Sequence, residues 1–154
     1  MINRRLVRET VLQALYAYQQ SGDSVQYITD TIIKEALGAE KEIRRFAEKL
    51  FFTTLQHQEE LDEVIIKHIQ NWEISRLALI DRLVLRMALT EFLYFEEIPT
   101  KVTINEAIEI VKKFSTAKSG RFINGILDAS VIELQADGKA QKTGRGLIQE
   151  SHKN

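Results

Sequence analysis

The sequence has no cysteine, a single proline (Pro99) and seven glycines among its 154 residues. Without cysteine the chain can form no disulfide, no cysteine-ligated zinc or iron–sulfur site and no thiolate nucleophile. The scarcity of proline and glycine predicts few tight turns, and therefore long helices rather than a many-stranded sheet. No segment approaches the ~20 apolar residues of a membrane span, and the first residues lack the apolar run of a signal peptide. We therefore expect a cytoplasmic protein that binds no membrane.

The charge of the chain is balanced overall but unevenly distributed. The 21 lysines and arginines against 22 acidic residues give a net charge of −1, so no general basic character indicates a nucleic-acid-binding protein. Residues 1–20, however, have a net charge of +2, and residues 110–127 carry four basic residues and no acid. If folding brings these two segments together, they form a local positive patch. The alternative is that they are short basic clusters on solvated helix faces.

Residues 3–20 are predicted to form a helix with one cationic end. Its apolar residues recur at helical spacing and define a core face. On the adjacent arc the helix is basic at its start and apolar to aromatic further along, which suits phosphate contacts at one end and a protein contact at the other. That arc consists of Arg4, Arg5 and Arg8, followed by Leu12 and Tyr16.

Further helices are predicted along the chain from apolar residues repeated every three or four positions. In residues 76–95 apolar residues occupy nearly every position around the helix axis, which predicts a central helix buried on all sides. Thr103 and Glu106 fit a capping box, so the next helix is expected to begin there. The last helix contains Gly125, which predicts close backbone packing. The other expected helices are residues 25–37 and residues 40–70, with a bend near 56–58.

Residues after Gln135 show no apolar periodicity. This pattern is typical of disordered chain ends. We therefore expect a helical domain over residues 1–135 and a disordered basic tail over residues 136–154.

The sequence offers no arrangement of residues for catalysis. His57 has Glu60 three residues later, but the Glu-x-x-His pair of di-iron helical bundles occurs nowhere, and neither His57 nor His68 belongs to a set of nucleophile, base and orienting residue. No glycine-rich phosphate loop follows a predicted strand. We therefore expect no enzyme activity, no bound metal and no cofactor. A binding module fits better, because clustered arginines and an aromatic at a helix junction suit unpaired nucleic acid.

Two ordered stretches are similar to motifs of the NusB family of bacterial transcription antitermination factors. They are residues 98–110 (IPTKVTINEAIEI) and residues 121–128 (RFINGILD). The arginine-rich start and residues 85–91 (LRMALTE) are also similar to the family, so the resemblance covers about residues 3–134.

The resemblance implies an all-α fold of about seven helices in two subdomains of three to four helices. It also implies a protein without catalytic activity that binds single-stranded boxA-type RNA of ribosomal transcripts together with NusE, a small-subunit ribosomal protein. In such an antitermination complex RNA polymerase reads through terminators. Some family members self-associate, so a homodimer is a further expectation.

The resemblance and the residue pattern together indicate two sets of contact residues. Lys118 departs from the family, because some members carry an acid there, and its positive charge suits RNA. The residues expected to bind RNA are Arg4, Arg5, Arg8, Lys118, Arg121 and Phe122. The residues expected to face NusE are Leu12, Tyr16 and Asp81.

Two other interpretations remain open at this point. The same fold occurs as the RNA-binding domain of an rRNA cytosine methyltransferase, so the chain could be a fragment of such an enzyme. A helical protein-interaction adaptor with no RNA function is the second alternative.

Overall fold

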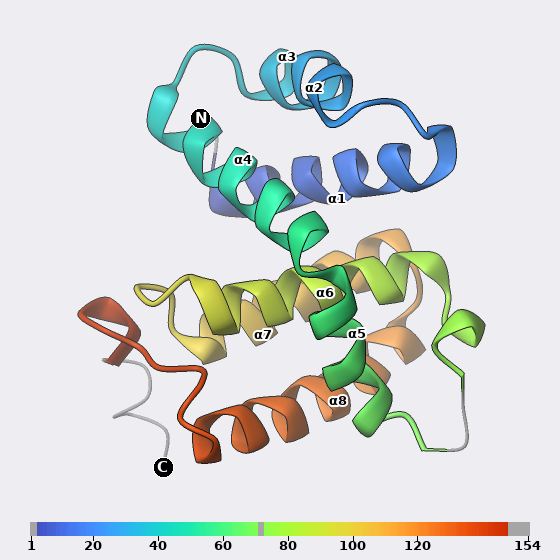
Figure 1. The fold of residues 1–154 in the computed structure, drawn as a ribbon, viewed down its shortest axis with the longest axis vertical. Helices are drawn as coiled ribbons and strands as arrows, with labels where there is room; N and C mark the ends of the chain where they lie inside the picture. Colours follow the sequence, from blue (N-terminus) through green and yellow to red (C-terminus); the bar gives the residue numbers. More distant parts are fainter. Residues whose placement is uncertain (1–2, 71–72, 148–154) are drawn as a thin grey trace. The chain divides into compact units, whose positions relative to one another are not determined.

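The computed structural model of the protein describes residues 3–70 and 73–147, in which it contains helices and no β-strand (Figure 1). The predicted all-α fold is confirmed. The chain divides after Gln56 into two compact units, residues 1–56 and residues 57–154. Among the helices of the described residues, none combines the length and the apolar character needed to cross a membrane.

Three helical segments form unit 1. The first and last, α1 and α4, pack against each other, and the middle segment contacts both. The side-chain oxygen of Asn3 caps α1 by accepting a 2.9 Å hydrogen bond from the Leu6 N–H. Gly22 ends the helix at a φ of 73°, a conformation that glycine adopts without strain. The segments are α1 (Arg4–Ser21), then α2 (Val25–Ile28), a π-helical turn (Thr29–Ile33) and α3 (Lys34–Leu37), and finally α4 (Lys41–Gln56).

Helices α5, α6, α7 and α8 make up most of the described part of unit 2, and α6 contacts the other three. Eleven of the sixteen α6 residues are buried, which confirms the predicted central helix. Its Arg86 is paired, because Nε and Nη2 donate to the two carboxylate oxygens of Asp62 at 2.7 and 2.9 Å. This bidentate pair ties α6 to α5. The elements are α5 (Gln58–Lys67), a 3₁₀ turn (Ile74–Arg76), α6 (Leu79–Tyr94), α7 (Thr100–Phe114) and α8 (Ala117–Ala136).

The predicted capping box at Thr103 is wrong. Helix α7 begins at Thr100, directly after Pro99, and Thr103 is a buried residue within it. The Thr103 hydroxyl donates a 2.8 Å hydrogen bond to Oε1 of Glu91, a buried carboxylate of α6. A buried charge is costly without hydrogen-bond partners, so this threonine stabilises α6 instead of capping α7.

The close packing predicted at Gly125 is also wrong. A Cβ placed on Gly125 would meet no atom within 4 Å. Gly120, in the first turn of α8, is the tightly packed position, because a Cβ there would lie 3.1 Å from Cγ of Lys112. Absence of a side chain at Gly120 therefore lets α8 approach α7.

In the described part of the segment after α8, which reaches residue 147, the chain makes contacts that the disordered tail expected from residue 136 did not include. It runs back to the end of α6 (Figure 1). The buried Lys142 ammonium donates to the carbonyl oxygens of Glu91 and Phe95 at 2.9 and 2.8 Å. The Thr143 N–H donates to the carbonyl of Glu96 at 3.0 Å. For residues 148–154, which lie outside the described residues, the expected disorder stays a prediction.

Candidate functional site

The start of α1 presents basic side chains where a helix ordinarily favours acidic ones. Arg4 and Arg5 are exposed, and residues 4–7 contain no aspartate or glutamate. The aligned peptide dipoles place about half a positive charge at a helix N-terminus, so these arginines add to it rather than offset it. The guanidinium carbon of Arg4 lies 4.0 Å from the centre of the Phe46 ring, which holds this side chain over an aromatic face. This end of unit 1 is therefore suited to an anion.

Two residues predicted to meet ligands on α1 are buried. Arg8 is 4% exposed and lies 5.7 Å from the centre of the Phe46 ring, and Leu12 is 2% exposed. All six residues from 7 to 12 are buried, so the middle of α1 is enclosed on every side. The prediction assumed that one face of the helix is exposed along its length, and this assumption is wrong. Tyr16, by contrast, is 41% exposed and accessible to a partner.

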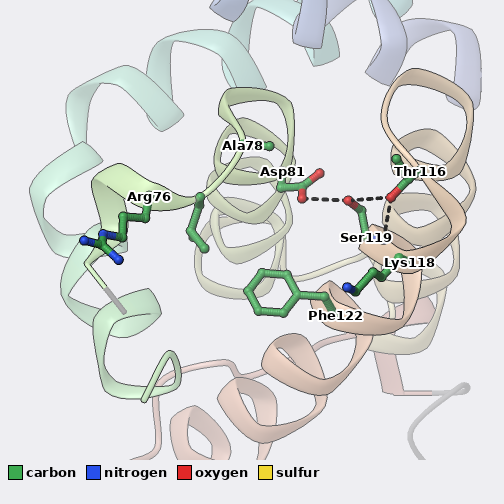
Figure 2. A pocket seen from close by; sticks show the side chains of 8 residues that line it. Arg76, Ala78, Asp81, Thr116, Lys118, Ser119 and Phe122 are labelled. Atoms are coloured by element: carbon green, nitrogen blue, oxygen red, sulfur yellow. Dashed lines mark hydrogen bonds between the residues drawn. The ribbon is translucent and has the colours of Figure 1, made fainter. Parts of the chain in front are cut away.

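A pocket of about 250 Å³ lies within unit 2, between the starts of α6 and α8 (Figure 2). The 3₁₀ turn and the first turn of α6 supply one wall, and the first turns of α8 supply the other. Three predicted site residues meet here: Asp81, Lys118 and Phe122. Five further residues complete the lining: Arg76, Leu77, Ala78, Thr116 and Ser119.

A chain of hydrogen bonds fixes the two walls of the pocket to each other. The Thr116 hydroxyl caps α8 by accepting a 3.0 Å bond from the Ser119 N–H, and it donates to the Ser119 hydroxyl at 3.1 Å. That hydroxyl donates in turn to Oδ2 of Asp81 at 2.8 Å (Figure 2). Asp81 is 6% exposed, and its Oδ1 accepts no hydrogen bond within the described part of the chain.

The three residues predicted to bind RNA in unit 2 are exposed around the start of α8. Lys118 lies in the first turn, where residues 117–120 include no acid, and Arg121 follows one turn later. Arg121 does not line the pocket. The Phe122 ring is 37% exposed and lies among the pocket residues in Figure 2. As at the start of α1, exposed cations therefore reinforce the positive end of a helix.

Sequence reasoning missed Arg76, Thr116 and Ser119. Thr116 followed by Ser119 directly before an apolar run is a helix-start pattern that could have located the wall of the pocket. Arg76 is an isolated cation before α6, and no local pattern distinguishes it from other surface arginines.

The fold and these two helix starts define an all-helical binding protein whose exposed cations and aromatic ring suit single-stranded nucleic acid. Comparison with known families is specific: the pattern of the NusB family matches residues 5–131. The chain belongs to the NusB family, which confirms the resemblance seen in the sequence.

The following relatives are similar to this chain over most of their own length. The transcription antitermination protein NusB of Salinibacter ruber is 49% identical over 96% of this chain and 92% of its own. A T. maritima NusB structure has a TM-score of 0.79 at 34% identity, covering 86% of this chain and 92% of that one. A structure of the antitermination factors NusB and NusE in complex with double-stranded RNA has a TM-score of 0.76 at 28% identity. The match covers 84% of this chain and 96% of that one.

Proposed function

We propose that this protein binds single-stranded boxA-type RNA of nascent ribosomal transcripts together with NusE. In this proposal it acts in the cytoplasm, within an antitermination complex in which RNA polymerase reads through terminators. Family membership supports the general function, and the structure of NusB relatives with NusE and RNA supports both classes of partner. The single observation that carries the RNA assignment is that α1 and α8 both begin with exposed cations and no acid.

The geometry suggests how each unit would contribute to RNA binding. Arg4 and Arg5 of unit 1 and Lys118 and Arg121 of unit 2 are exposed and can reach phosphates. Phe122 offers a ring on which a base can stack, an interaction that tolerates different bases. Arg8 is omitted from this set because it is buried. We propose that both basic helix starts contact the same RNA.

We assign the contact with NusE to Tyr16. Its ring is exposed on α1, and tyrosine is among the residues that most often anchor protein interfaces. Leu12 is buried and is not part of this proposal. Asp81 belongs to the wall of the pocket, so a direct contact with NusE is not required to explain its position.

Titration of labelled boxA-type RNA with the protein, in the presence and absence of NusE, tests the proposal. We expect binding by the wild type, tighter binding with NusE, and weaker RNA binding by a variant with both Arg4→Ala and Arg5→Ala. Lys34→Ala is the matched control, because Lys34 is an exposed cation of unit 1 outside the start of α1. NusE binding with no affinity for RNA would instead favour the adaptor interpretation.

The Tyr16→Ala variant separates the two partners. We expect it to weaken NusE binding by about 1–2 kcal/mol while the affinity for RNA alone stays unchanged. Equal NusE affinity for wild type and variant would remove Tyr16 from the interface.

A further inference from the structure

The Ser119 hydroxyl lies at the centre of the hydrogen bonds that join the start of α8 to α6 (Figure 2). It donates to Oδ2 of Asp81 at 2.8 Å and accepts from the Thr116 hydroxyl at 3.1 Å. The Ser115 hydroxyl lies 3.1 Å from it and is the donor of this third bond, because the single proton of the Ser119 hydroxyl is used toward Asp81. A serine hydroxyl has one donor and two acceptor positions. All three are therefore used within the protein.

This saturation decides which kind of role Ser119 can have. A hydroxyl that contacts RNA needs a free donor or acceptor position, and the Ser119 side chain is half-buried as well. The exposed groups proposed to bind RNA in unit 2 lie within three residues of it on the same helix, namely Lys118, Arg121 and Phe122. An effect of Ser119 on RNA binding therefore has to pass through these neighbours.

The start of α8 needs support from outside the helix. Its first turn carries Lys118 and no acid, so a cation faces the positive end of the helix dipole, which is unfavourable. Asp81 of α6 is 6% exposed, and its bond with Ser119 holds the carboxylate against this helix start, where a negative charge is favourable. The first turn of α8 thus obtains from α6 the acidic group that its own sequence lacks.

We propose that Ser119 is a positioning residue for the RNA contacts at the start of α8, an inference that rests on the proposed RNA-binding function. Its hydroxyl fixes the first turn of α8 to Asp81, so that Lys118, Arg121 and Phe122 are in place before RNA arrives. Without the hydroxyl this turn loses its attachment to α6, and the three side chains have to be ordered on binding, at a cost in affinity. The expected signature is a loss of RNA affinity that depends on these three side chains.

A mutant cycle measured by RNA titration tests the proposal. We expect Ser119→Ala to weaken binding of a boxA-type oligonucleotide by about three- to tenfold, because a hydrogen bond to a charged acceptor is lost. Ser119→Thr keeps the hydroxyl and should restore the wild-type affinity. In a background with alanine at Lys118, Arg121 and Phe122, Ser119→Ala should have no further effect, because the groups that it positions are absent. The basic start of α1 is intact in this background and keeps binding measurable.

Ser130→Ala is the matched control. Ser130 is a buried serine of the same helix, and its hydroxyl donates at 2.7 Å to the carbonyl of Ile126, a bond within α8. We expect this variant to bind RNA as the wild type does, even where its melting temperature is lower. If thermal melting shows that Ser119→Ala is unfolded, Thr116→Ala takes its place, since it removes the donor to Ser119 and the cap of α8. It should show the same dependence on the three side chains.

Each contrary result has its own meaning. A folded Ser119→Ala variant that binds RNA as tightly as the wild type would overturn the assignment. Equal weakening by Ser119→Ala in the wild type and in the triple-alanine background would also overturn it, because Ser119 would then act by another route. A wild type with no affinity for the intact RNA would remove the proposed function itself, and the positioning role with it.

Discussion

Lys142→Met should release the segment that follows α8. In the structure the Lys142 ammonium is buried and donates to two carbonyl oxygens at the end of α6, those of Glu91 and Phe95. Each of these oxygens also accepts a backbone N–H, from Phe95 at 3.2 Å and from Ile98 at 3.1 Å, and this end of the helix carries the negative end of its dipole. A lysine at this point therefore serves both as hydrogen-bond donor and as a favourable charge. Methionine keeps much of the apolar stem but supplies neither.

The magnitude follows from the two hydrogen bonds. A hydrogen bond that involves a charged group contributes about 1.5–3 kcal/mol, and methionine avoids the cost of burying an ammonium. We therefore expect a net loss of about 2–4 kcal/mol in the stability of the docked segment. The Thr143 amide, bonded to the Glu96 carbonyl at 3.0 Å, should exchange its hydrogen faster by a corresponding factor.

Amide hydrogen exchange with urea unfolding is the assay, and Lys139→Met is the matched control. Lys139 is exposed and lies three residues earlier in the same segment. Gly146→Ala should reproduce the effect, because a Cβ there would overlap the Glu96 carbonyl oxygen. Equal Thr143 exchange rates in Lys142→Met and Lys139→Met would refute the role assigned to the ammonium.

Three further predictions concern single contacts. Asp62→Asn should lower the free energy of unfolding by about 3 kcal/mol, because it leaves the buried Arg86 without its carboxylate partner. Glu63→Gln, which changes an exposed neighbour, should leave the free energy of unfolding unchanged, and urea denaturation measures both variants. Burial and the hydrogen bond to Glu60 raise the pKa of Tyr94 to about 12, so alkaline absorbance titration should show one late tyrosine, which Tyr94→Phe removes. The stabilisation that this raised pKa gives to the folded protein is complete below the unfolded-state pKa of about 10 and is lost as the pH rises through 12. Titration of Tyr94 with a pKa near 10 in the folded protein would contradict this prediction. Arg8→Ala should destabilise the protein by about 1–2 kcal/mol in thermal melting, because the guanidinium is buried near Phe46; a loss of RNA affinity at unchanged stability would show that it faces the ligand.

Periodicity and family motifs were sufficient for the architecture. The bend near residues 56–58 and the burial of α6 follow from apolar spacing, which reports directly on regular helices packed in a core. The motif over residues 121–128 led to Arg121 and Phe122, which are exposed at the start of α8.

Contacts between distant parts of the chain could not be predicted in the same way. Thr103 has the spacing of a cap, but its actual partner is a carboxylate twelve residues away on another helix. Lys142 reaches backbone carbonyls, which leave no trace in the sequence pattern. Arg8 is buried because the middle of α1 is covered on all sides, whereas a helical-wheel projection assumes one exposed face. The pocket unites Asp81 with Phe122 through Ser119, a contact that depends on the packing of α6 and α8.

The salt dependence of RNA affinity tests the central claim most directly, namely that the basic starts of α1 and α8 contact one RNA. Each lost phosphate contact with a single strand should reduce the slope of log affinity against log salt by about 0.7. We predict a reduction of about 1.4 for Arg4→Ala with Arg5→Ala, the same for Lys118→Ala with Arg121→Ala, and about 2.8 for all four substitutions together. A combined variant whose slope equals that of either pair, or of the wild type, would contradict the account.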